Sequence, residues 1–216
     1  MLATSDFYEP VDEYVGDQAW FEAVENRLPA GWVLRRESIW FMAGPADVQL
    51  PQHGFKLHVA PDLQRLDEQF DLLVGHLITC RTPFKLVRDR RLVTVTNSKV
   101  FSRTGSGKFF TIYPPSFEAF IALASSLAAL MQGFNGPYIL TDRRVPDSQA
   151  VFYRYGGFLP VREAGGDGEI YQLIRRPDGS TDLDVRRPGF VLPAGIADPF
   201  PAAERQGGSN QAGLLG

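Results

Sequence analysis

The sequence predicts an α+β fold with a central, largely antiparallel or mixed sheet and flanking helices. Strand-like and helix-like segments follow one another without the strict alternation of a doubly wound sheet. The chain has 216 residues, 44% of them hydrophobic, which is enough for one compact core. We therefore expect one domain over residues 1–200, with an aromatic-rich segment at 1–50 packed on it, and a flexible tail or linker at 201–216.

The first half of the chain is predicted to contain two helices and three strands. A short helix is expected around Asp17–Leu28, ended by a Pro-Ala-Gly sequence. Residues 55–59 alternate apolar and polar, which is typical of a half-buried strand. Pro61 then begins a helix with an apolar stripe that reaches residue 78. Two further strands are expected at Phe84–Arg88 and Arg91–Thr96, separated by a charged turn.

The second half is predicted to contain four strands and one long helix. A polar stretch at 97–107 leads into a strand at Lys108–Tyr113, which two prolines end. Ser116 is a good N-cap for a helix at Phe117–Gln132. The remaining strands are expected at Tyr138–Leu140, Val151–Tyr155 and Glu169–Ile174.

Composition excludes several classes of function. The net charge of −3 argues against a general nucleic-acid-binding protein, which needs a positive field. The single cysteine, Cys80, excludes an internal disulfide and is typical of a reducing compartment. The first residues resemble no signal peptide, and no apolar run is long enough to span a bilayer. We expect a cytoplasmic protein that binds neither nucleic acid nor membrane.

Familiar catalytic motifs are absent from the sequence. The glycine-containing stretch Thr104–Lys108 lacks the first glycine and the final Ser/Thr of a phosphate-binding loop, and it precedes a predicted strand instead of a helix. Three histidines and one cysteine offer few zinc ligands, and none has helical spacing. No nucleophile elbow is present. We expect no metal and no cofactor.

Basic residues on predicted strands are the unusual feature. Lys56 and His58 leave the same face of one strand, and Lys85, Lys108 and Arg154 each lie on or at the start of another apolar strand. For any one of them, a solvated face of an amphipathic sheet is the more common explanation. Together they indicate an anion, because like charges on one sheet face repel. A phosphate ester could then undergo β-elimination, with a lysine of lowered pKa as base and a histidine as acid.

Several strings, in the same order from about Phe7 to about Pro193, resemble the N-terminal lyase domain of class III lanthionine (lanthipeptide) synthetases. They are His53-Gly54-Phe55-Lys56-Leu57-His58-Val59, Phe84-Lys85, Asn97-Ser98-Lys99, Gly105-Ser106-Gly107-Lys108-Phe109-Phe110-Thr111-Ile112-Tyr113-Pro114, Gly136-Pro137-Tyr138-Ile139-Leu140-Thr141-Asp142-Arg143-Arg144 and Tyr153-Arg154-Tyr155-Gly156-Gly157-Phe158. The domain is in turn similar to bacterial effector phosphothreonine lyases. The resemblance implies a metal-independent lyase that eliminates phosphate from phosphoserine and phosphothreonine of a precursor peptide, giving dehydroalanine and dehydrobutyrine. It also implies partners: the phosphorylated leader–core peptide, and kinase and cyclase domains that follow the lyase in a full synthetase.

The resemblance also implies roles for individual residues. Lys85 would be the catalytic base, His58 the general acid and Lys56 a phosphate contact. Further phosphate-binding positions match Arg103, Lys108, Tyr113, Arg154, and either Arg143 or Arg144. Because Lys108 and Tyr113 are even and odd positions of one predicted strand, we expect only one of the two to face the pocket unless the strand has a bulge.

Two other functions compete with this prediction. A non-catalytic module that binds a phosphopeptide or a leader needs phosphate contacts but no base. A phosphatase would restore serine or threonine. The mass of the product separates the three, since only elimination leaves a peptide lighter than its unphosphorylated form by one water.

Overall fold

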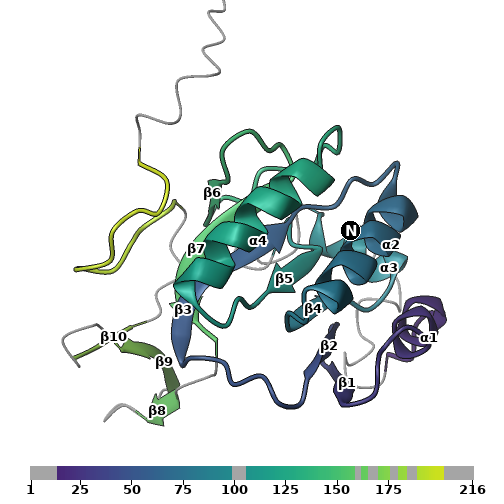
Figure 1. The fold of residues 1–216 in the computed structure, drawn as a ribbon, viewed down its shortest axis with the longest axis horizontal. Coiled ribbons are helices and arrows are strands. Elements are labelled where there is room, and N and C mark those ends of the chain that lie inside the picture. The colour runs from purple at the N-terminus through teal and green to yellow at the C-terminus, as the bar shows by residue number, and fades with distance from the viewer. Residues whose placement is uncertain are drawn as a thin grey trace, which may run out of the picture.

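The computed structural model describes residues 14–98, 106–158, 162–164, 170–175, 180–183 and 189–201. Its main feature is a seven-stranded sheet in the order β1-β2-β4-β5-β3-β7-β6, in which every neighbouring pair is antiparallel (Figure 1). The strands are β1 (Trp32–Glu37), β2 (Trp40–Pro45), β3 (His53–Val59), β4 (Phe84–Val87), β5 (Phe110–Ile112), β6 (Arg143–Arg144) and β7 (Val151–Gly157). With its four helices this sheet confirms the α+β class.

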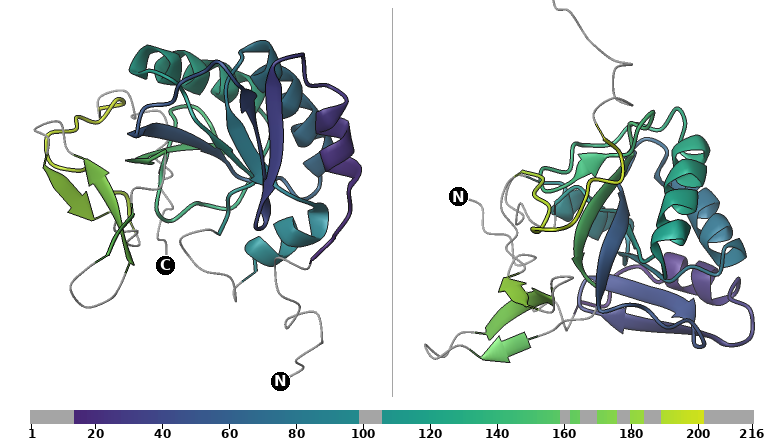
Figure 2. Two further views of the ribbon diagram at one scale, coloured as in Figure 1. Left: turned by 90° about the horizontal axis from the view of Figure 1, so that it is seen from below. Right: turned by 60° about the vertical axis from the view of Figure 1, so that its left-hand side comes forward.

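The helices cover the sheet unequally. They are α1 (Ala19–Glu25), α2 (Leu66–Thr79), α3 (Arg90–Thr96) and α4 (Phe117–Leu130). The long helices α2 and α4 lie side by side on one face of the sheet, whereas α3 lies on the other side (Figures 1 and 2). The Ser116 hydroxyl accepts a hydrogen bond from the Ala119 amide at 3.1 Å, so the predicted cap of α4 is confirmed.

The two faces of the sheet differ in chemistry because side chains alternate along each strand. On β3, Phe55, Leu57 and Val59 enter the core beneath the long helices. Their register partners Phe110 and Ile112 do the same. We call the opposite face, which carries Lys56, His58, Lys85 and Thr111, the polar face.

Two predicted strands are wrong. Residues 91–96 form part of helix α3, because the Asp89 carboxylate caps the first turn by accepting from the Leu92 amide at 2.8 Å. The β-branched residues there had favoured a strand, but the cap and the burial of Val93 and Thr96, three apart, stabilise a helix. Residues 138–140 form no strand, because the Ile139 carbonyl accepts from the Asp142 amide and turns the chain.

The hairpin of β1 and β2 was not predicted; it lies within the aromatic-rich segment, whose Trp20 and Phe41 belong to the core. Three further strands, β8 (Arg162–Ala164), β9 (Ile170–Arg175) and β10 (Thr181–Leu183), form a separate small antiparallel sheet (Figure 2). The predicted tail at 201–216 lies, apart from Pro201, outside the described residues.

Candidate active site

The predicted base and acid lie in one row across the polar face. Lys85 on β4 pairs with Thr111 on β5, and Thr111 pairs with His58 on β3. Side chains of register partners project from the same face. Since neighbouring strands are about 4.8 Å apart, the backbones of Lys85 and His58 are separated by roughly 10 Å. This spacing leaves room for one substrate residue between the two side chains.

A second row of register partners, beside the first, carries two positively charged side chains. Lys56 on β3 pairs directly with Arg154 on β7. The Lys56 Nζ lies 5.6 Å from the ring centre of Tyr113 and 5.9 Å from that of Phe158. An anion above this row would be attracted by both cations, and arginine offers paired donors that match phosphate oxygens.

His58 is held by a carboxylate that the sequence did not single out. Its Nδ1 is hydrogen-bonded to Asp142 Oδ2. The other oxygen, Oδ1, accepts from the Thr141 hydroxyl at 2.6 Å and lies 3.6 Å from Lys108 Nζ. His58, Asp142 and Lys108 are all buried. A neutral His58 therefore carries its proton on Nδ1, which donates to the Asp142 carboxylate. Its Nε2 is left to exchange a proton with a substrate.

Burial and charge set the ionisation of this cluster. Burial opposes ionisation of Asp142, but attraction to His58 and Lys108, together with its hydrogen bonds, outweighs burial and lowers the pKa of Asp142. Burial lowers the pKa of His58 to about 3, against the opposing attraction of Asp142. Lys108 already balances the charge of Asp142, so an imidazolium would add an uncompensated buried charge. His58 is thus neutral at pH 7 when no anion is bound.

Lys85 lies beside an aromatic ring on the same face. Its Nζ is 4.6 Å from the ring centre of Trp40, and its register partner on β2 is Met42. Trp40 and Met42 place apolar surface on the side of Lys85 away from His58. The amine is therefore bordered by apolar side chains on one side and by Thr111 on the other.

Lys108 and Tyr113 both reach the polar face, which we expected only if the strand had a bulge. Strand β5 covers only residues 110–112, and the consecutive residues Phe109 and Phe110 both enter the core. Alternation is interrupted between these two phenylalanines, which has the effect of a bulge. Lys108 consequently lies beside Asp142, and the Tyr113 ring lies beside Lys56.

Of the two neighbouring arginines, Arg144 lies on the polar face. It pairs with Phe152, the register partner of His58, and its guanidinium lies 5.5 Å from the Phe152 ring centre. Its Nε is buried and has no hydrogen-bond partner. Arg143 pairs with Tyr153 on the other face, where it forms an ion pair with Asp198. The structure therefore does not bring Arg143 to the cluster.

Arg103 lies outside the described residues, so its predicted phosphate contact stays a prediction.

Asp142 was missed as a site residue although it lies within one of the strings that carried the resemblance. No spacing rule connects it to His58, because 84 positions separate the two residues. Only the tertiary fold brings them together.

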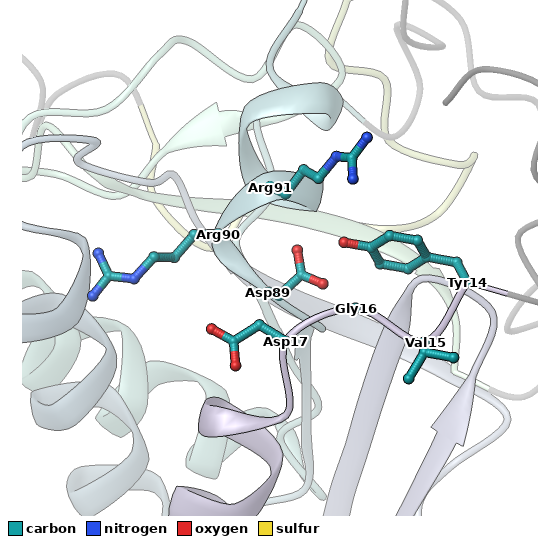
Figure 3. Close-up of a pocket in the computed structure, with 7 residues that line it drawn as sticks. All are labelled: Tyr14, Val15, Gly16, Asp17, Asp89, Arg90 and Arg91. Carbon is teal, nitrogen blue, oxygen red and sulfur yellow. The ribbon is translucent and has the colours of Figure 1, made fainter. Parts of the chain in front are cut away.

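A separate cavity of about 470 Å³ lies at the end of β4 and contains none of the predicted site residues. Figure 3 shows its lining residues, with the Tyr14 hydroxyl pointing toward Asp89. Burial and Asp89 raise the pKa of Tyr14 to about 12. The neighbouring Arg88 donates to the carbonyl groups of Tyr14 and Val15, at 2.7 and 3.0 Å. These contacts fasten the N-terminal segment to the end of β4, so we interpret this cavity as structural.

The family model described as "RamC, N-terminal domain" matches residues 20–212. The chain belongs to this family. It is 36% identical over 179 residues to a protein of Streptomyces coelicolor described as "Probable SapB synthase". That alignment covers 83% of this chain but only 19% of the relative, so the chain spans about a fifth of the relative's length. The match confirms the resemblance to the N-terminal domain of lanthionine synthetases.

Solved structures with a similar fold include two bacterial effectors. The phosphothreonine lyase OspF from Shigella flexneri has a TM-score of 0.48 and 19% identity, over 69% of this chain and 85% of that one. The phosphothreonine lyase SpvC from Salmonella has a TM-score of 0.47 and 15% identity, over 62% of this chain and 74% of that one.

No helix in the described part of the chain is long and apolar enough to cross a bilayer. The chain is related to the N-terminal part of a probable synthase, over about a fifth of that relative's length.

Proposed function

We propose that the chain is a phosphoserine/phosphothreonine lyase that converts these residues of a precursor peptide to dehydroalanine and dehydrobutyrine. One observation carries the proposal: Lys85 and His58 flank Thr111 in one row, beside the directly paired cations Lys56 and Arg154. A phosphate over Lys56 and Arg154 would leave the α-carbon and the bridging oxygen of the same residue within reach of Lys85 and His58. Membership of the lanthionine synthetase family supports the peptide as substrate.

The reaction is a balanced β-elimination. The neutral amine of Lys85 takes the proton from the α-carbon, and the electron pair of that C–H bond forms the Cα=Cβ double bond. The bond between Cβ and the bridging oxygen breaks, and its electron pair goes to phosphate. His58 gives a proton from Nε2 to the bridging oxygen as it leaves. Inorganic phosphate is released, and no water is consumed.

The other site residues assist in different ways. Lys56, Arg103, Arg154 and Arg144 would bind phosphate oxygens, and Tyr113 would border the site through its contact with Lys56. Lys108 holds Asp142 ionised, which fixes the orientation of the His58 ring. A bound phosphate dianion opposes the burial effect on His58 and so favours the imidazolium that the acid step needs.

We also propose the setting in which the domain acts. It would extend over residues 1–200 of a cytoplasmic protein and need neither metal nor cofactor. A kinase domain would supply its phosphorylated peptide, and a cyclase domain would use its product, as the synthetase family implies. Residues 201–216 would link the domain to the kinase.

The direct test is the mass of a synthetic phosphothreonine peptide after incubation with the chain. Elimination gives a product lighter by one water than the unphosphorylated peptide, together with free phosphate. A peptide restored to its unphosphorylated mass would indicate a phosphatase. An unchanged peptide that nevertheless binds would indicate the alternative, a non-catalytic phosphopeptide-binding module.

A further inference from the structure

A second cavity, of about 300 Å³, adjoins the polar face on the β1 side. Its lining includes Val33, Met42, Val48, Leu50, Tyr113 and Phe158. Among the described residues that line it, Arg35 is the only charged one. We call this cavity the apolar groove.

The apolar groove is continuous with the proposed catalytic site at two points. Its floor residue Met42 is the register partner of Lys85. Its lining also includes Tyr113 and Phe158, whose rings are in edge contact at 5.4 Å, and the Lys56 Nζ lies within 6 Å of both ring centres. A chain that leaves the site past Lys85 therefore enters the groove directly.

The distance from Lys85 to the groove matches the distance from the phosphoresidue to a neighbouring residue of an extended peptide. Met42, which lines the groove, lies about one strand spacing, roughly 4.8 Å, from Lys85. An extended peptide advances about 3.5 Å per residue. The side chain that reaches the groove thus belongs to a residue one or two positions from the phosphoresidue.

The chemistry of the groove selects an apolar side chain. Val33, which lines the groove, exposes 50% of its surface, and the half-buried Met42 lines the same groove. Burying an aliphatic side chain against this surface is favourable, whereas burying an ammonium group is not. Arg35, the register partner of Met42, repels a basic side chain further.

We propose that the apolar groove is a specificity subsite that binds an aliphatic side chain one or two residues from the phosphoserine or phosphothreonine. The inference rests on the proposed function, since it names the peptide that the lyase prefers. It assigns a role to the β1–β2 hairpin, which carries none of the proposed catalytic residues. The preference for such peptides would arise when the substrate binds, before the chemical step.

The test uses phosphothreonine peptides that carry leucine, alanine or lysine in turn at each position within three residues of the phosphothreonine. We expect the 216-residue chain to have a kcat/KM about ten-fold higher for leucine than for alanine at one of these positions, and lowest for lysine. In Val33→Asp this preference should collapse. The control Leu63→Glu changes an exposed apolar residue outside the groove and should keep the full preference.

Two results would overturn the subsite: equal kcat/KM values for leucine and alanine at every position, or an unchanged preference in Val33→Asp. Failure of the proposed function is distinguishable, because then no phosphopeptide is converted by the wild-type chain. In that case the dissociation constants of the same peptides, labelled and followed by fluorescence anisotropy, give the leucine preference and its dependence on Val33. A flat binding series would reject the subsite independently of catalysis.

Discussion

At the scale of single residues, the proposed mechanism depends on two groups with opposite proton requirements. Lys85 must be neutral to accept a proton, and His58 must be charged to give one. The apolar surface of Trp40 and Met42 borders the lysine, whereas Asp142 orients the histidine. Each requirement can be tested by a substitution that keeps most of the local shape.

Lys85→Arg should abolish elimination while binding of the phosphopeptide remains within a few-fold. Arginine keeps the positive charge but cannot act as a base at neutral pH. Product mass and fluorescence anisotropy measure the two effects on the same peptide. Turnover in Lys85→Arg at the wild-type rate would remove Lys85 from the role of base.

His58→Ala and Asp142→Asn should each slow elimination about a hundred-fold, the range of a lost general acid. Asparagine cannot fix the His58 ring as a carboxylate does, so Asp142→Asn should lower kcat more than it changes KM. The loss should shrink for a substrate whose leaving group is a weaker base and needs no proton. If the rate depends equally on leaving-group basicity in wild type and His58→Ala, His58 is a ligand or packing residue.

At the scale of secondary-structure elements, the short strand β6 has contacts on both sides. It follows Asp142 and presents Arg144 to the polar face. On the other face, Asp198 binds Arg143 and accepts from the Tyr153 hydroxyl at 2.7 Å. The segment 189–201 therefore holds β6 from the side opposite the proposed site.

Asp198→Ala should lower both stability and activity. The Tyr153 hydroxyl would lose its carboxylate acceptor and Arg143 its ion pair, at a cost of about 2 kcal/mol in the free energy of unfolding. Movement of β6 should also lower kcat, because Arg144 and Asp142 lie on or beside that strand. Urea unfolding and steady-state kinetics measure the two effects.

The matched control is Asp71→Ala. Asp71 also pairs with an arginine, Arg27, at 2.6 Å, but both side chains are largely exposed. Its loss should change the free energy of unfolding by less than about 1 kcal/mol and leave kcat unchanged. Equal effects of the two substitutions would show that segment 189–201 does not support the site.

The elements themselves show what the sequence could predict. Period-two alternation identified β3, and a good cap residue identified α4. Helix α3 was predicted as a strand because its β-branched residues outweighed, in a local reading, the cap that Asp89 provides. The sequence left open a bulge between Lys108 and Tyr113 but could not place it at Phe109–Phe110, because its position depends on tertiary packing.

At the scale of the whole molecule, the common face of Lys56 and His58 was predictable, whereas the arrangement of the other site residues around them was not. Lys56 and His58 share a strand, so their common face follows from alternation alone. The positions of Lys85 and Asp142 relative to them depend on the strand order β4-β5-β3 and on a turn far along the chain. Sequence patterns fix local periodicity, whereas strand order is a property of the assembled sheet.

The buried cluster also links the stability of the whole molecule to pH. His58 has a pKa near 6.5 when unfolded and about 3 when folded, so unfolding takes up a proton between these values. The contribution of His58 is therefore fully present above about pH 6.5 and is lost as pH falls toward 3. Asp142, whose pKa is also lowered by folding, adds a loss of the same sign at lower pH, below about 4.

We therefore expect the free energy of unfolding to fall as pH decreases from 7 to 4.5, by up to about 1.4 kcal/mol per pH unit for the His58 proton. Urea unfolding at half-unit steps of pH measures this slope. In His58→Gln the slope should decrease by nearly one proton. His76→Gln is the control, since His76 is only partly buried and burial lowers its pKa too, so the slope should change less. An unchanged slope in His58→Gln would mean that His58 already carries its proton in the folded protein, held as an ion pair with Asp142.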